Sequence, residues 1–147
     1  MIIEPHGVLG RYGNFGALEK YVGNRQIAER AQKAYSAVGI GRAPEELTPL
    51  FLEKGALSGD EIAAKLWEDI GFEIGIMLTN IAWLLNPDRI VIGGGIAKAG
   101  PLVFERVNRT IRERFITSIS RWSQPNWVTM EALSAVPRWP SPPRNVD

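Results

Sequence analysis

Three consecutive glycines follow a short run of β-branched residues and could bring backbone N–H groups against a bound ligand. The run Arg89–Ile92 is too short for a helix and lies between a proline and the glycines, so we predict a buried strand there. The glycines Gly93–Gly95 lead towards a segment with helical periodicity, from about Pro101 to Phe115. A strand, a glycine turn and a helix in this order commonly hold a phosphate or nucleotide. The letters GGG match neither GxGxxG nor a Walker A loop, so a tight turn that only needs positive φ explains them about as well.

Glu19 is the carboxylate with the most suggestive setting. It follows a loop, Gly7–Gly16, in which every third residue is glycine, and it lies in a predicted short helix, Ala17–Val22. A carboxylate can accept hydrogen bonds from two neighbouring hydroxyl groups, which suits a sugar. An acidic residue is also favoured at the start of a helix by the helix dipole, and the residues alone leave both explanations open. The single histidine, His6, is interpreted as a surface loop residue.

Composition excludes several classes of protein. The 147 residues are enough for one domain with a core, and 17 basic residues nearly balance 16 acidic ones, so we expect no nucleic-acid partner. The most apolar stretch, Ile74–Leu85, is too short to span a membrane. Cysteine is absent and the first residues do not form a signal peptide, so we expect a cytoplasmic protein without disulfides or thiolate metal sites.

The elements that must position these groups are mostly helices. The predicted helices beyond the first short one are Arg25–Val38 with Asn24 as its N-cap, Glu45–Lys54 ended by Gly55, about Gly59–Leu85 started by a capping box of Ser58 and Glu61, and the segment from Pro101. A short first strand, Met1–Glu4, and a last strand, Trp127–Leu133, complete the pattern.

The longest predicted helix has a continuous apolar seam, and beyond Ile74 almost every side is apolar. We therefore expect its second half to be buried all round. Gly71 and Gly75 lie on one side of this helix, where each costs about 1 kcal/mol relative to alanine. We expect them to permit close approach of another backbone, as a packing feature. The charged residues of the segment after Pro101 are interpreted as a solvated face.

Two segments resemble landmarks of the ROK family of bacterial sugar kinases and repressors, which have the actin-like ATPase fold. Gly13–Tyr21 is similar to the family's CGxxGCxE segment, and Asn86–Ala97 is similar to its NPxxIVIGGG strand and turn. The resemblance implies an α/β fold: a partial actin-like ATPase (ribonuclease H-like) lobe, helix-rich, with an incomplete central sheet. It covers residues 1–134, and 135–147 would be a proline-rich tail outside the family pattern, disordered or draped on the surface.

The resemblance also implies roles for individual residues. Glu19 and Asn14 would bind the sugar, and Gly93, Gly94 and Gly95 would line the nucleotide side of a shared cleft, with ATP and Mg²⁺ as cofactors. The family's three zinc cysteines fall on Gly10, Tyr12 and Ala17, so no zinc is expected.

By the same resemblance, the family's phosphate loop, its catalytic-base aspartate and its first sugar-contacting pair all precede the region covered. The chain would be the carboxyl-terminal half of a glucokinase-like or fructokinase-like enzyme, inactive alone and without a catalytic residue of its own. The alternatives are the sugar-sensing module of a ROK-type repressor and a degenerate remnant without catalysis. Because strands of the central sheet would be missing, we expect a homo-oligomer or a partner chain.

Overall fold

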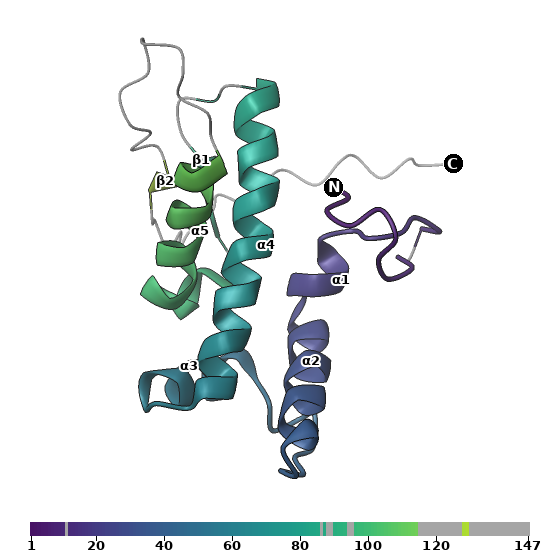
Figure 1. The fold of residues 1–147 in the computed structure, drawn as a ribbon, viewed down its shortest axis with the longest axis vertical. Coiled ribbons are helices and arrows are strands. Elements are labelled where there is room, and N and C mark those ends of the chain that lie inside the picture. Colours follow the sequence, from purple (N-terminus) through teal and green to yellow (C-terminus); the bar gives the residue numbers. More distant parts are fainter. Residues whose placement is uncertain (11, 86, 88–89, 94–95, 115–127, 130–147) are drawn as a thin grey trace, which may run out of the picture.

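A computed structural model of the chain describes residues 1–10, 12–85, 87, 90–93, 96–114 and 128–129. Its elements are α1 (Glu19–Val22), α2 (Asn24–Ala37), α3 (Pro49–Leu57), α4 (Glu61–Leu85), β1 (Ile90–Val91), the 3₁₀ helix η1 (Ile96–Ala99), α5 (Pro101–Arg114) and β2 (Val128–Thr129). The long helix α4 is the axis of the molecule, with α5 on one side and α1 and α2 on the other (Figure 1). The two strands pair in parallel, with Ile90 opposite Val128. Within the described part, the sheet has two strands.

The core lies where α2, α3 and α5 meet the first two-thirds of α4. Side chains three or four residues apart on α4 point into it, because this spacing returns to the same helix face. The buried members from α4 include Leu66, Trp67, Ile70 and Ile74. Helix α2 contributes Ile27, Ala31 and Tyr35, and α5 contributes Val103, Val107 and Ile111. Among the described helices, none is both long and apolar enough to span a bilayer.

The two glycines of α4 confirm the predicted close approach. A Cβ atom on Gly71 would lie 2.8 Å from the Cβ of Arg106 and 2.9 Å from the main-chain oxygen of Val103. A Cβ on Gly75 would lie 2.5 Å from the Cβ of Thr110. These contacts are far shorter than ordinary van der Waals contacts, so α5 packs directly on the backbone of α4.

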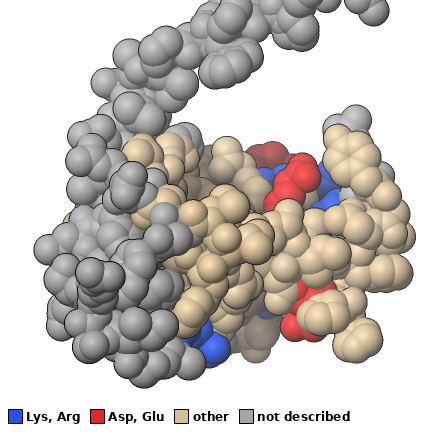
Figure 2. All heavy atoms as spheres, turned by 90° about the horizontal axis from the view of Figure 1, so that it is seen from above, with Lys and Arg blue, Asp and Glu red and all other residues tan. Residues whose placement is uncertain are grey.

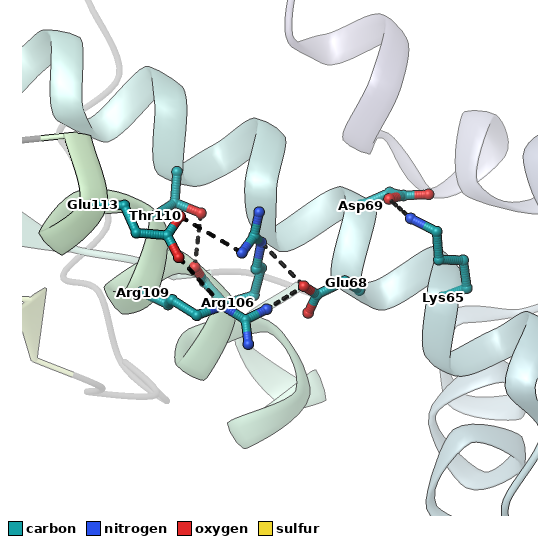
Figure 3. A network of polar contacts seen from close by, with 7 residues as sticks. All are labelled: Lys65, Glu68, Asp69, Arg106, Arg109, Thr110 and Glu113. Carbon is teal, nitrogen blue, oxygen red and sulfur yellow. Dashed lines mark hydrogen bonds and ion pairs between the residues drawn. The ribbon is translucent and has the colours of Figure 1, made fainter.

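Beside this crossing, ion pairs join α4 and α5 (Figure 3). Glu68 pairs with Arg106 at 3.2 Å and also with Arg109. The guanidinium of Arg106 lies 4.8 Å from the centre of the Phe72 ring, and its side chain is 17% exposed. The prediction of a solvated face on α5 therefore holds for the exposed residues Glu105, Arg109, Arg112, Glu113 and Arg114. It is wrong for Arg106, which covers an aromatic ring.

Helix α4 begins at a cap that the sequence analysis placed wrongly. Asp60, and not Ser58, caps it: Oδ1 of Asp60 accepts hydrogen bonds from the N–H groups of Ile62 and Ala63 at 3.0 and 3.1 Å. Ser58 instead ends α3. The hydroxyl of Tyr35 donates to the other Asp60 oxygen, so the cap also ties α2 to α4.

Two other helix boundaries differ from the prediction. Helix α3 starts at Pro49, with the Thr48 hydroxyl accepting a hydrogen bond from the N–H of Phe51 at 3.2 Å, and it continues past Gly55. Thr48 followed by proline is a stronger start signal than the acidic pair before it. Helix α2 has Gly23 as its N-cap, and Asn24 is its first helical residue without a capping hydrogen bond from its side chain.

The second half of α4 is not buried all round. Leu84 and Leu85 are 79% and 68% exposed. Figure 2, which looks onto the end of the molecule towards which α4 points, shows a described surface with few charged side chains. The predicted burial was wrong because an apolar composition says which residues tolerate burial, whereas the covering element must come from elsewhere in the chain or from a partner.

Candidate functional site

The loop before α1 contains two glycines with positive φ, and at one of them a side chain would collide with the backbone. Gly16 has a φ of +66°, and a Cβ there would lie 1.5 Å from the main-chain oxygen of Glu4. Gly13 has a φ of +79°. Antiparallel bridges between Ile2 and Ala17 and between Leu9 and Phe15 close the loop. The prediction that glycines permit a tight, irregular path is confirmed, and the predicted first strand is reduced to a bridge.

Side chains from α1, α2 and α4 fix this loop to the core. The hydroxyl of Tyr21 accepts a hydrogen bond from the N–H of Val8 at 3.1 Å. Arg30 donates to the main-chain oxygen of Tyr21 at 2.9 Å and pairs with Glu73 of α4 at 2.8 Å. Because Arg30 and Glu73 are both about three-quarters or more buried, this ion pair holds the end of α1 firmly against α4.

Glu19 is the first residue of α1 and is exposed. Among the described residues, its carboxylate has no hydrogen-bond or ion-pair partner, so both oxygens are available to hydroxyl groups. Asn14 is half-buried in the glycine loop, where its main-chain oxygen accepts a hydrogen bond from the N–H of Gly10 at 2.5 Å. A short polar segment on a fixed loop can orient a small hydroxylated ligand, because little conformational freedom is lost on binding.

The second predicted site begins after β1. Gly93 is exposed, its φ lies outside the left-handed region, and a Cβ placed on it would meet nothing within 4 Å. The requirement for positive φ is therefore absent at Gly93, and its backbone faces open space. Gly94 and Gly95 lie outside the described residues, as do the tail 135–147 and most of the predicted last strand. A shared cleft between this turn and Glu19 stays a prediction.

The described residues contain no group of three or more metal-binding side chains. The chain has no cysteine, and His6 is exposed, with its backbone N–H donating to Glu4 at 3.3 Å. The donor set therefore does not fit a structural zinc ion of cysteine and histidine ligands.

A basic hollow beside α1 was missed by the sequence analysis. It has a volume of about 270 Å³ and is lined by Val8, Lys20, Arg25, Gln26, Glu29, Arg30 and Lys33. Helix periodicity would have placed the α2 members on one face, but only the fold brings the loop and α1 against them.

The comparisons with a family model, with curated proteins and with solved structures all match proteins of one family. The ROK family model matches residues 1–128. Among curated relatives, the transcriptional repressor Mlc of Escherichia coli is 28% identical over 120 residues, which are 81% of this chain and 30% of Mlc. The dual regulator NagC of the same organism is 30% identical over 110 residues, 74% of this chain and 27% of NagC. The glucokinase of Thermotoga maritima is 26% identical over 110 residues, 71% of this chain and 35% of the enzyme.

Solved structures show the same fold. A ROK family glucokinase from Streptomyces griseus, in complex with glucose and AMPPNP, superposes with a TM-score of 0.71 at 23% identity over 84% of this chain and 42% of that one. A ROK regulator homologous to E. coli Mlc gives a TM-score of 0.67 at 26% identity, over 78% of this chain and 29% of that one. The chain spans about a third of the length of these curated relatives, and its helix-rich fold is a partial lobe of the actin-like ATPase type. The chain belongs to the ROK family.

Proposed function

We propose that this chain is the sugar-binding, carboxyl-terminal half of a ROK-type hexose kinase and that it transfers no phosphoryl group by itself. The observation that carries the proposal is the exposed carboxylate of Glu19, unpartnered among the described residues, at the end of a rigid glycine loop inside a family match to residues 1–128. In this proposal Glu19 accepts hydrogen bonds from sugar hydroxyls, and Asn14 can both accept hydrogen bonds from them and donate to them.

Phosphoryl transfer requires a cradle for the phosphates and a positioned base for the attacking hydroxyl. By the resemblance, both belong to the part of the family fold that lies upstream of this region. Gly93 supports a nucleotide on this side, because its open backbone leaves room for a phosphate or a ribose. In the complete kinase, Gly93, Gly94 and Gly95 would contact ATP, and the ATP with Mg²⁺ would supply the phosphoryl group.

A partner that completes the fold also belongs to the proposal. Leu84, Leu85 and Val91 are 42–79% exposed at the end of α4 and on β1, and the described surface at this end carries few charges (Figure 2). Exposed apolar residues at the end of a long helix and on a two-stranded sheet favour a further lobe on the same or another polypeptide. A second copy of this chain is the alternative, and light scattering distinguishes the two.

Calorimetry with a panel of hexoses tests the sugar site. Glu19→Gln should weaken binding about tenfold or more, because hydrogen bonds to a charged group contribute about 1.5–3 kcal/mol. Glu61→Gln is a matched control, since Glu61 is also an exposed first residue of a helix. Affinity that is unchanged in Glu19→Gln would remove Glu19 from the sugar site. Hexose-dependent ATP hydrolysis by the purified chain would refute the proposal that the chain is inactive by itself.

The second candidate is the sugar-sensing module of a repressor, which the similarity to Mlc and NagC favours, at 28% and 30% identity against 26% for the T. maritima glucokinase. Adding the amino-terminal half of a ROK glucokinase separates the two. Restored hexose phosphorylation supports the kinase, whereas sugar binding without phosphorylation in the assembled pair supports the sensor.

A further inference from the structure

We propose that the basic hollow beside α1 is a binding site for the phosphoryl group of a small phosphorylated ligand. The hollow is formed by three segments: Val8 from the glycine loop, Lys20 from α1 and one face of α2. Four of its lining side chains are cationic and one is a carboxylate, whereas the whole chain carries a net charge of only +1. The lining of the hollow therefore carries an excess of positive charge.

Two of the four cations are already neutralised by ion pairs. Arg25 pairs with Glu29 at 2.8 Å, and Arg30 pairs with Glu73 at 2.8 Å. Lys20 and Lys33 form no ion pair among the residues that the structure describes. They approach the hollow from different helices, so an anion between them would be attracted by two ammonium groups. A lysine ammonium is a compact charge with three donors and binds phosphate as a point charge.

The shape of the hollow favours a small ligand. A volume of about 270 Å³ lies just below the range of pockets for drug-sized ligands, about 300–1,000 Å³. A nucleic-acid surface would need an extended basic stripe, whereas this hollow is a single depression of limited volume. The ion pair of Arg30 with Glu73 fixes one wall, because both side chains are largely buried.

The hollow adjoins the candidate sugar loop through Lys20, which follows Glu19 directly. The phosphate site does not depend on the sugar assignment, because its cations and its volume are independent of Glu19. Phosphate binding can therefore fail while sugar binding persists, and the reverse holds as well.

The test is a titration of the ¹⁵N-labelled full chain with inorganic phosphate, in which the amide chemical shifts are measured by NMR. Chloride keeps the ionic strength constant throughout. Saturable shifts should be confined to residues around Lys20 and to the first three turns of α2. Shifts no larger than those caused by chloride, or shifts located elsewhere, would overturn the proposal.

Variants make the assignment specific. Lys20→Gln and Lys33→Gln should each weaken phosphate binding about threefold, and the double variant roughly tenfold, as partly exposed charge pairs contribute up to about 1 kcal/mol. Lys54→Gln, an exposed helical lysine outside the hollow, is the matched control and should bind as the wild type does. An unchanged titration in the double variant would contradict the site.

Two further ligands identify the source of the anion. A hexose 6-phosphate should cause the same shifts as phosphate, and the unphosphorylated hexose should not move the resonances of Lys33 and its neighbours. A short DNA duplex at the same ionic strength should bind no more tightly than phosphate. Tighter saturable binding of the duplex would replace the small-ligand site with a nucleic-acid surface.

Discussion

Substituting both glycines of α4 by alanine tests the packing on which the fold depends. Propensity alone predicts that Gly71→Ala/Gly75→Ala stabilises the helix, by about 1 kcal/mol at each position. The structure predicts the opposite sign. Ordinary contacts of a Cβ atom begin at 3.4 Å, so an alanine at position 75 requires the Cβ of Thr110 to retreat by about 0.9 Å.

No side-chain rotation relieves these contacts. The Cβ of Thr110 is fixed by its backbone, and the contacts of position 71 are the Cβ of Arg106 and the main-chain oxygen of Val103. Helix α5 must therefore move away from α4, which opens the packing of Val107 and Ile111 behind it. Overpacking of this kind costs about 1–3 kcal/mol per site. After subtraction of the gain in propensity, about 1 kcal/mol per site, we expect a net loss of up to about 4 kcal/mol for the double variant.

Urea unfolding followed by circular dichroism measures this loss. Ala64→Gly, on an exposed turn of the same helix, calibrates propensity and should cost about 1 kcal/mol. A double variant that is more stable than the wild type by about 2 kcal/mol would show that propensity acts alone, and the close crossing of α4 and α5 would be refuted.

Four other predictions follow, three from the described contacts and one from the absence of the family's zinc cysteines. Burial alone would raise the pKa of Asp60, but hydrogen bonds from Tyr35, Ala63 and Ile62 outweigh it and hold the pKa below its ordinary value of 3.8. The stability that Asp60 contributes is thus complete above about pH 4 and is lost as the pH falls through the lowered pKa, and Asp60→Ala should remove about 1–2 kcal/mol at pH 7 and flatten the acid limb of unfolding curves. Burial, followed by the bond to Asp60, raises the pKa of Tyr35 to about 12. The stability that neutral Tyr35 contributes therefore persists below pH 10 and is lost as the pH rises towards 12; a steady stability across that interval would contradict the raised pKa. Arg30→Gln leaves Glu73 buried without its partner, should cost about 1–3 kcal/mol, and should speed proteolysis within residues 1–18, whereas Arg25→Gln, at an exposed pair, should change neither. Zinc and chelators should leave the melting temperature unchanged, because the positions of the family's zinc cysteines are Gly10, Tyr12 and Ala17; a zinc-dependent rise in melting temperature would refute this.

The long helices could be predicted almost to the residue. The expected ends at Leu85 and at Pro101 coincide with those of α4 and α5, because many apolar residues in register outweigh any single boundary signal. Boundaries that rest on one residue were less reliable. Ser58 and Asp60 both precede α4, and both can cap a helix. Tyr35, 25 residues earlier in the chain, bonds to Asp60 and favours that cap.

Part of the candidate site could likewise be predicted from the sequence, and part could not. The glycine loop, Glu19 and the turn after β1 could be selected from the sequence, because their residue types are unusual in their local context. The basic hollow could not, since Val8, Lys20 and Lys33 are ordinary surface residues until the fold brings α1 and α2 together.

The sequence by itself determined the long helices and the family to which the chain belongs. These features depend on which side chains follow one another along the chain, and this can be read directly from the sequence. Tertiary structure alone decided that Gly71 and Gly75 meet α5, that Arg30 finds Glu73 across 43 residues, and that the end of α4 is left uncovered. The reason is physical: burial and ion pairing are properties of two surfaces, and the partner surface belongs to a distant part of the chain.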